Sequence, residues 1–206
     1  RATPPTMSNR EHDVVLFGAT GFTGRLVAEY LVRTYPAGSF RLALAGRSKD
    51  KLERERRELA RIGPHAAELP ILVADSHDRE ALDAVAGSAR VVCTTVGPYA
   101  RHGAELVAAC AAKGTHYCDL TGEAHFVRRM IDAHHDEARR TGARIVHACG
   151  FDSIPSDLGV FLLHRAFTER HGGKLREARL YVVGARGGAS GGTMASALGI
   201  IEEAAK

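Results

Sequence analysis

The chain has no long apolar run and few aromatic residues. No run in its 206 residues approaches the about 20 that a membrane-spanning helix needs, and the longest, such as Val91–Val96, have the length of strands. Aromatic residues make up 6% of the chain and do not alternate with basic ones, which argues against a surface that stacks single-stranded nucleic acid. The charged run 49–61 mixes both signs and predicts a solvated helix face. We therefore expect no nucleic-acid partner.

The cysteines and histidines show no spacing typical of metal ligands. None of the four cysteines forms a C-x-x-C pair, and their apolar surroundings predict small buried side chains in a reducing compartment. The eleven histidines show no ligand spacing, and the adjacent His134 and His135 must point to different parts of a helix surface. The sequence therefore predicts neither a disulfide framework nor a metal site.

A third absence concerns catalysis. Short-chain dehydrogenases donate a proton from the tyrosine of a Tyr-x-x-x-Lys pair. The residues four positions before the lysines are Ala45, Arg47, Ala109, Arg170 and Glu202. None is tyrosine, so that active site is excluded from this segment.

The most informative feature present is a glycine turn. The apolar run 13–17 ends in Gly18, Gly21 and Gly24, spaced G-x-x-G-x-x-G, and a helical pattern follows at once. We expect Phe22, Leu26, Val27, Tyr30 and Leu31 to share one face of that helix. A strand, a glycine turn and a helix N-terminus together form the pyrophosphate site of dinucleotide-binding folds. Residues Gly18, Ala19, Thr20, Gly21, Phe22 and Thr23 are therefore cofactor-binding candidates.

Strand-like and helix-like segments alternate up to Gly150. The expected strands are 13–17, 41–45, 71–74, 90–95, 115–120 and 144–149, and the expected helices are 22–34, 50–62, 78–86, 103–113 and 124–141. Asp78 is a plausible N-cap, and Gly114 and Gly142 follow the ends of two helices. This alternation predicts an α/β fold with a doubly wound parallel sheet.

The regular alternation of strand-like and helix-like segments ends after Gly150. A helix is expected from Pro155 to about 169, a strand over 175–183, a glycine-rich stretch over 184–192 and an amphipathic segment to Lys206. We interpret 1–11 as a flexible leader with Met7 as a natural start, 12–153 as the dinucleotide-binding domain, and 154–206 as a linker helix and the incomplete start of a second α/β domain. On this interpretation the chain is a truncation or a fragment.

Residues after the second strand predict which dinucleotide binds. An acidic residue there selects NAD by bonding the ribose 2′-hydroxyl, whereas a cation accommodates the 2′-phosphate of NADP. The strand ends in Gly46-Arg47-Ser48, with no carboxylate before Asp50. Arg47 and Ser48 therefore predict NADP(H). The alternative is a surface arginine beside a helix-capping serine.

Two further strand ends complete the expected cofactor site. Asp75 and Ser76 follow the third strand, where the adenine would lie, although a helix-capping pair explains them equally well. Thr95, Val96, Gly97 and Pro98 follow the fourth strand and should pass beneath the nicotinamide ribose. A purely structural turn is the alternative.

Candidate catalytic residues are weaker. Tyr99 could donate a proton from the fourth strand end, and Asp152 and Ser153 follow the sixth strand on the same edge. A partly buried lid residue explains Tyr99, and turn and N-cap chemistry around Pro155 explains the other two. Asp119, Thr121 and Glu123 form a further polar group that an ion pair or a cap would explain.

The chain resembles the saccharopine dehydrogenase-like (saccharopine reductase-type) oxidoreductases, and among them the actinobacterial trans-acting enoyl reductases. The resemblance covers nearly everything from about residue 12 onward. Its matching segments are Gly18–Gly24, Leu44–Ser48, Thr94–Tyr99, Asp119–Glu123 and Ala148–Asp157. The first and third also occur in other reductases, whereas the last two are much more specific. Ser190–Thr193 is similar to the entry into the family's second domain.

The resemblance implies an N-terminal Rossmann domain, a C-terminal substrate and dimerisation domain, and an NADPH-dependent reductase. The implied substrate is a small molecule or acyl thioester, in the enoyl reductases a C=C bond of a lipid intermediate in glycolipid biosynthesis. It also implies a cytoplasmic location at or near the inner face of the plasma membrane, peripheral lipid association and a homodimer. Two alternatives stay open: imine reduction as in saccharopine metabolism, and a non-catalytic NADP-binding sensor or scaffold.

Overall fold

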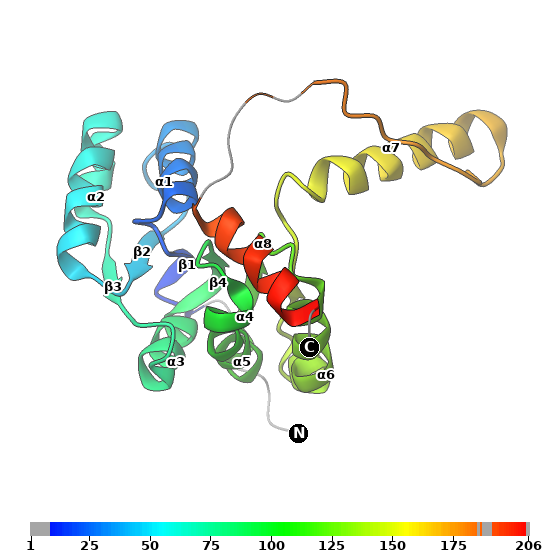
Figure 1. Cartoon of the computed structure of the whole chain (residues 1–206). Coiled ribbons are helices and arrows are strands. Elements are labelled where there is room, and N and C mark those ends of the chain that lie inside the picture. Colours follow the sequence, from blue (N-terminus) through cyan, green and yellow to red (C-terminus); the bar gives the residue numbers. More distant parts are fainter. Residues whose placement is uncertain (1–8, 185, 187–190, 205–206) are drawn as a thin grey trace.

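The computed structural model describes residues 9–184, 186 and 191–204 (Figure 1). Residues 1–8 of the expected leader, Met7 included, lie outside the described residues. So do Ser190, most of the glycine-rich stretch between 184 and 191, and the last residues of the expected C-terminal segment.

A six-stranded parallel sheet forms the centre of the molecule, with the order β3-β2-β1-β4-β5-β6. Its strands are β1 (His12–Phe17), β2 (Leu42–Gly46), β3 (Ile71–Val73), β4 (Ala89–Thr94), β5 (His116–Asp119) and β6 (Ile145–Val146). The order reverses direction between β1 and β4, which confirms the doubly wound parallel sheet. The last strand is shorter than expected, because the chain turns at Ala148, whose φ is +58°.

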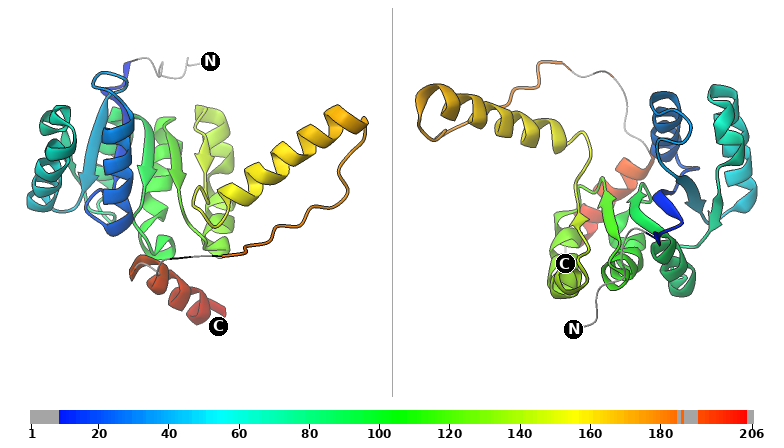
Figure 2. Two further views of the ribbon diagram at one scale, coloured as in Figure 1. Left: turned by 90° about the horizontal axis from the view of Figure 1, so that it is seen from above. Right: turned by 180° about the vertical axis from the view of Figure 1, so that it is seen from behind.

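Helices cover the two faces of this sheet unequally. They are α1 (Phe22–Thr34), α2 (Lys49–Ile62), α3 (Arg79–Ser88), α4 (Tyr99–His102), α5 (Ala104–Lys113) and α6 (Ala124–Thr141), with a 3-10 turn η2 (Pro64–Glu68). α1 and α2 lie on one face, and α3, α5 and α6 lie on the other (Figures 1 and 2). The short α4 was not expected as a separate helix. Gly114 and Gly142 adopt positive φ at helix ends, as expected.

Alternating strand residues divide the core into two clusters. Val15, Phe17 and Val92 pack with α3, α5 and α6, whereas Leu16 and Leu44 pack with α1 and α2. Because side chains of a strand point alternately to opposite faces, consecutive apolar residues serve both clusters.

Only two of the five apolar residues expected on one face of α1 pack against the core. Phe22, Leu26 and Tyr30 are exposed, whereas Val27 and Leu31 are partly buried against the core. The buried positions are Gly24, Ala28 and Val32. Small residues face the sheet because the helix lies very close to the β1 turn, and larger side chains do not fit there.

Two helices follow the sheet. α7 (Ile154–His171) projects away from it, as both figures show, and none of its residues is buried. The chain after α7 is extended but pairs with no described strand, so the strand expected over 175–183 is wrong. α8 (Gly191–Ala204) returns to the carboxyl edge of the sheet, where Ser196 contacts Glu123. The contact between Ser196 and Glu123 thus connects the C-terminal helix to the expected cofactor edge.

The cysteines are all free and only one is fully buried. Cys110 is enclosed in the core, whereas the other three, Cys93, Cys118 and Cys149, are partly exposed. Cys93 and Cys118 are register partners on β4 and β5. The expectation of small buried side chains therefore holds for Cys110 and only partly for the rest.

Candidate functional site

The glycine turn after β1 requires glycine at two of its positions. Gly18 has a φ of +89°, and a Cβ atom there would lie 2.6 Å from Cγ2 of Val96. A Cβ atom on Gly24 would lie 2.1 Å from the carbonyl oxygen of Gly18. The turn and the first turn of α1 are therefore packed backbone against backbone, as the G-x-x-G-x-x-G pattern predicts.

The outer side of this turn is open. Gly21 and Phe22 are exposed, and a Cβ atom on Gly21 would meet only the Gly18 oxygen, at 3.4 Å. Gly21 is the N-cap of α1, no side chain caps that end, and its first turn holds no acidic residue. The first N–H groups of the helix are thus available to an anion, which fits the pyrophosphate of a dinucleotide.

All expected cofactor residues lie along one edge of the sheet. The parallel registers place the ends of β1, β2, β3 and β4 side by side. Along this edge lie Gly18, Ala19, Thr20, Gly21, Phe22, Thr23, Arg47, Ser48, Asp75, Ser76, Thr95, Val96, Gly97 and Pro98. Oγ1 of Thr95 donates to the Gly18 carbonyl at 3.2 Å, so the β4 turn directly supports the glycine turn.

Arg47 is exposed just after β2. Within the described part of the chain, no ion pair or side-chain hydrogen bond engages its guanidinium. Ser48 is the N-cap of α2 by backbone position, but its side chain makes no cap bond. Both side chains are therefore available to a ligand at this corner.

The residues after β3 combine capping with contacts to α4. Oδ1 of Asp75 accepts the backbone N–H of His77 at 2.9 Å, and Asp78 caps α3 by accepting from Ala81 at 3.1 Å. Oγ of Ser76 lies 3.3 Å from Nδ1 of His102 on α4. Asp75 thus holds the turn before α3, Ser76 faces α4, and the helix cap expected from this pair is supplied by Asp78 instead. Neither His77 nor His102 was among the sequence candidates.

Tyr99 is directed into the protein. Its side chain is buried, and its hydroxyl donates to the Thr94 carbonyl at 3.2 Å. Burial raises the pKa of the Tyr99 phenol above its usual value. The hydroxyl is therefore committed to holding the end of β4, and Tyr99 is a fully buried residue rather than the partly buried lid residue that was the alternative.

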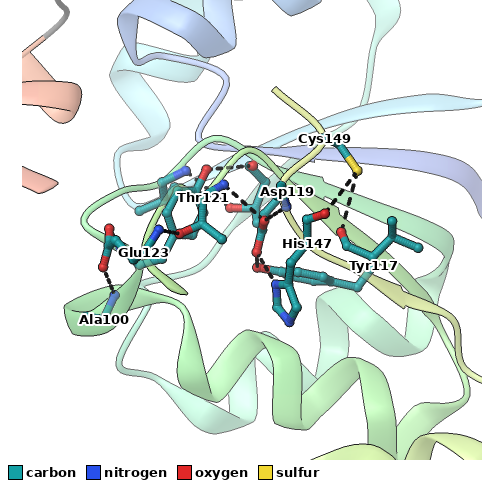
Figure 3. Close-up of polar contacts among 12 residues, drawn as sticks. Ala100, Tyr117, Asp119, Thr121, Glu123, His147 and Cys149 are labelled. Atoms are coloured by element: carbon teal, nitrogen blue, oxygen red, sulfur yellow. Dashed lines mark hydrogen bonds and ion pairs between the residues drawn. The ribbon is translucent and has the colours of Figure 1, made fainter. Parts of the chain in front are cut away.

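Glu123 connects the segments around this turn. Its two carboxylate oxygens accept the backbone N–H groups of Tyr99, at 2.9 Å, and Ala100, at 2.8 Å (Figure 3). Oγ of Ser196 on α8 donates to the same carboxylate at 2.8 Å. Sequence analysis offered a cap or an ion pair for Glu123, and the structure shows a cap, supplied to α4 from a different strand end.

Asp119 organises the neighbouring strand ends (Figure 3). Its Oδ2 accepts the Tyr117 hydroxyl at 2.8 Å and Nδ1 of His147 at 2.7 Å. Its Oδ1 accepts the backbone N–H groups of Thr121 and Ala148, each at 3.1 Å. Four donors compensate the buried carboxylate. Burial and the adjacent Asp119 raise the pKa of Tyr117 well above its usual value.

The remaining candidates lie just before α7. Asp152 is exposed, and its carboxylate lies over Gly122 and Gly150, because Cβ atoms there would come within 3.3 Å and 2.6 Å of it. Ser153 is the N-cap of α7 by position but makes no side-chain cap bond. Its carbonyl accepts Oγ of Ser156 at 2.8 Å. Both lie on the same sheet edge as the glycine turn, within a tight turn.

The described ranges hold neither a cluster of metal ligands nor a helix able to span a membrane. Residues 9–184, 186 and 191–204 contain no cluster of three or more His, Cys, Asp or Glu side chains that could hold a metal ion. Within the same ranges no helix combines the length and apolarity needed to cross a membrane.

A known protein family matches the part of the chain that forms the sheet. The saccharopine dehydrogenase NADP-binding domain matches residues 14–146, from the third residue of β1 to the end of β6. The solved saccharopine dehydrogenase (L-Glu forming) of Saccharomyces cerevisiae superposes with a TM-score of 0.59 over 78% of this chain and 32% of its own, at 19% identity. That likeness supports the fold.

Curated relatives are much more similar in sequence. A trans-acting enoyl reductase of Mycobacterium leprae is 53% identical over 83% of this chain and 40% of its own length. A trans-acting enoyl reductase of Mycobacterium tuberculosis strain H37Rv is 51% identical over 84% of this chain and 40% of its own. The chain thus spans less than half the length of these curated relatives.

Proposed function

Since the chain belongs to the family of saccharopine dehydrogenase NADP-binding domains, we propose that it is the cofactor-binding part of an NADPH-dependent reductase. The proposed reaction is reduction of the C=C bond of an enoyl or acyl lipid intermediate. The proposed binding of NADPH is supported above all by the N-terminus of α1. This end of the helix is open and uncapped beside the glycine turn, and it lies on the same sheet edge as Arg47. The substrate part rests on the names of relatives that are 51% and 53% identical to this chain over the aligned 40% of their own length.

Each part of the edge has a proposed role. Backbone amides of Gly21–Thr23 would hold the pyrophosphate, and Arg47 with Ser48 would hold the ribose 2′-phosphate. Asp75 and Ser76 would border the adenine, and Thr95–Pro98 would border the nicotinamide ribose. NADPH supplies a hydride when bound, whereas the chain supplies binding and orientation.

The proton that must accompany the hydride is not assigned to Tyr99. Its hydroxyl is buried and bonded to the Thr94 carbonyl, which leaves it no open path to a substrate. Asp152 and Ser153 remain weak candidates, because they lie on the cofactor edge but in a turn next to α7. A proton donor from the part of the relatives that this chain does not span is an equal candidate.

We propose that residues 154–206 belong to a second domain, separate from the dinucleotide-binding unit of residues 12–153. α7 supports this proposal because it has no buried residue although Leu158, Phe161 and Leu162 are apolar. A helix with apolar residues on all sides needs cover from other protein. Homodimerisation through that domain and peripheral lipid association are the corresponding partner proposals. Sedimentation and liposome flotation of a protein with the full length of the relatives would test them.

Cofactor titration tests the proposed function directly. NADPH and NADH would be titrated into the chain while cofactor fluorescence is followed, and tighter binding of NADPH is expected. A full-length protein should then oxidise NADPH when an enoyl thioester is added. Preference for NADH would contradict the role of Arg47. Cofactor binding without turnover on enoyl or imine substrates would instead indicate a non-catalytic sensor.

A further inference from the structure

Two histidines meet at the adenosine end of the sheet edge. His77 lies between β3 and α3, and His102 is the last residue of α4. Nε2 of His77 lies 3.1 Å from Nδ1 of His102, and the ring centroids are 5.1 Å apart. Oγ of Ser76 approaches the same Nδ1 at 3.3 Å. Ser76 and the two imidazoles, called the histidine cluster below, thus join the ends of β3 and β4.

The contacts of Nδ1 leave Nε2 as the ring atom of His102 that can meet a ligand. Nε2 bonds to no other described residue and is not enclosed by the protein. In the imidazolium form both ring nitrogens carry hydrogen, whichever tautomer the neutral ring adopts. A protonated His102 therefore presents an N–H donor on the cofactor edge.

Charged and titratable groups surround His102 from three elements. Arg47 at the end of β2 and Arg101 on α4 are cations, His77 lies in the β3–α3 turn, and Asp75 is the acidic neighbour. Burial lowers the pKa of His102 first, and the charges of His77, Arg47 and Arg101 lower it further, against the opposite effect of Asp75. In the free protein His102 is therefore neutral near pH 7, inside a field that favours an anion.

We propose that His102 and His77, together with Arg47, recognise the 2′-phosphate on the adenosine of NADP(H), and that binding of this phosphate takes up a proton on the histidine cluster. The inference rests on the proposed cofactor site. A phosphate monoester, whose second pKa is about 6, is largely dianionic at neutral pH. Its charge favours the imidazolium form and offsets the repulsion among the cations. The cluster would thereby distinguish NADPH from NADH.

The direction of the pH effect follows from this linkage. As pH falls from about 8 to about 6.5, protonation of His102 on ligand binding becomes easier while most of the phosphate stays dianionic. NADPH should therefore bind more tightly toward pH 6.5. NADH lacks the phosphate, so its affinity should change little.

The experiment uses the intact chain and two pairs of ligands. NADPH and NADH, and separately 2′,5′-ADP and 5′-AMP, would be titrated at pH 6.5, 7.2 and 8.0 into wild type, His102→Gln and His77→Gln. Glutamine keeps a donor but cannot be protonated. His164→Gln is the matched control, because His164 is exposed on α7. Calorimetry in buffers with different ionisation heats would count the protons taken up.

The expected result is a loss of about ten-fold in NADPH and 2′,5′-ADP affinity in His102→Gln, with NADH and 5′-AMP unchanged. Proton uptake should fall as well. Equal losses for both ligands of a pair would indicate a merely structural role and overturn the proposal. So would a wild-type NADPH affinity that does not depend on pH, a result that needs no variant. If wild type binds neither NADPH nor NADH, the proposed function fails too, whereas NADPH binding that is indifferent to the histidines overturns this inference alone.

Discussion

The carboxylate of Glu123 accepts the backbone N–H of Tyr99 at 2.9 Å and so fixes the start of α4. The same carboxylate accepts from Ala100 and from Ser196 on α8. A side chain that follows β5 therefore determines where the β4 turn lies, and that turn carries the residues proposed to border the nicotinamide ribose.

Replacement of Glu123 by glutamine should destabilise the protein. One carboxylate oxygen becomes an NH₂ group facing a backbone N–H, so a buried donor loses its acceptor. We expect the free energy of unfolding to fall by about 2 kcal/mol in urea denaturation. Glu68→Gln is the control, since Glu68 is exposed and bonds to no described side chain. Equal unfolding midpoints for both variants would show that the cap contributes nothing.

Alanine at Gly24 should disrupt the cofactor site. Its Cβ atom would lie 2.1 Å from the Gly18 carbonyl oxygen, so α1 must move away from the turn. We expect a loss of about 3 kcal/mol in stability and a large loss of NADPH affinity, measured by thermal unfolding and fluorescence titration. Gly159→Ala in α7 meets no atom within 4 Å and should stabilise by up to about 1 kcal/mol. A Gly24→Ala protein that melts and binds like wild type would refute the close approach.

Removal of the Arg47 side chain should change cofactor preference. Arg47→Ala is expected to weaken NADPH binding about ten- to a hundred-fold, because a charge-assisted hydrogen bond to the 2′-phosphate is lost, while NADH binding changes little. The matched control is Arg54→Ala, an exposed residue of α2 without a described ion pair. Parallel titrations with both cofactors measure the ratio of NADPH affinity to NADH affinity. If Arg47→Ala leaves this ratio unchanged, the 2′-phosphate is bound by other residues.

Asp13 should make the free energy of unfolding depend on pH. The guanidinium of Arg41 donates to both carboxylate oxygens of Asp13, each at 3.1 Å, and Arg90 donates at 3.2 Å. These bonds, those from Arg41 foremost, hold the pKa of Asp13 well below its usual value. A carboxyl whose pKa is lowered by folding stabilises above its unfolded pKa of about 3.9, and this contribution disappears as pH falls through the folded value.

Asp13→Asn should therefore cost about 1 kcal/mol at pH 7, the size typical of a partly exposed ion pair. The difference from wild type should shrink below about pH 4, because the Asp13 carboxyl of the unfolded chain is then protonated while that of the folded protein stays ionised. Urea unfolding of both proteins at pH 7, 5 and 3 gives the comparison. A penalty that is the same at pH 3 as at pH 7 would contradict the linkage.

Much of the sheet follows from local sequence, because buried parallel strands need unbroken apolar runs and glycines mark the turns. The apolar face of α1 could not be predicted in the same way. Phe22, Leu26 and Tyr30 have helical spacing, but the close contact of Gly24 with Gly18 turns the small residues toward the sheet. The strand expected over 175–183 alternates as a strand should, yet pairing requires a neighbour, and no described strand supplies one.

The candidate site shows the same limit. The close packing of the glycine turn was predictable because it belongs to a local motif, whereas the role of Arg47 stays a prediction drawn from its place after β2. The contacts of Glu123 and His102 were not predictable, because they join segments far apart in the chain. Ser196 is 73 residues from Glu123, and Ser76 is 26 residues from His102. The sequence spacing of these residues does not predict that they are in contact.

One hydrophobic cluster of the described residues ends at Ile145 and the other at Cys93. Neither cluster includes a described residue of α7 or α8. An exchange of this unit between related reductases, joined just before Ile154, would leave both clusters intact. Engineers could then pair one cofactor preference with another protein's substrate half, provided that a serine is retained opposite Glu123.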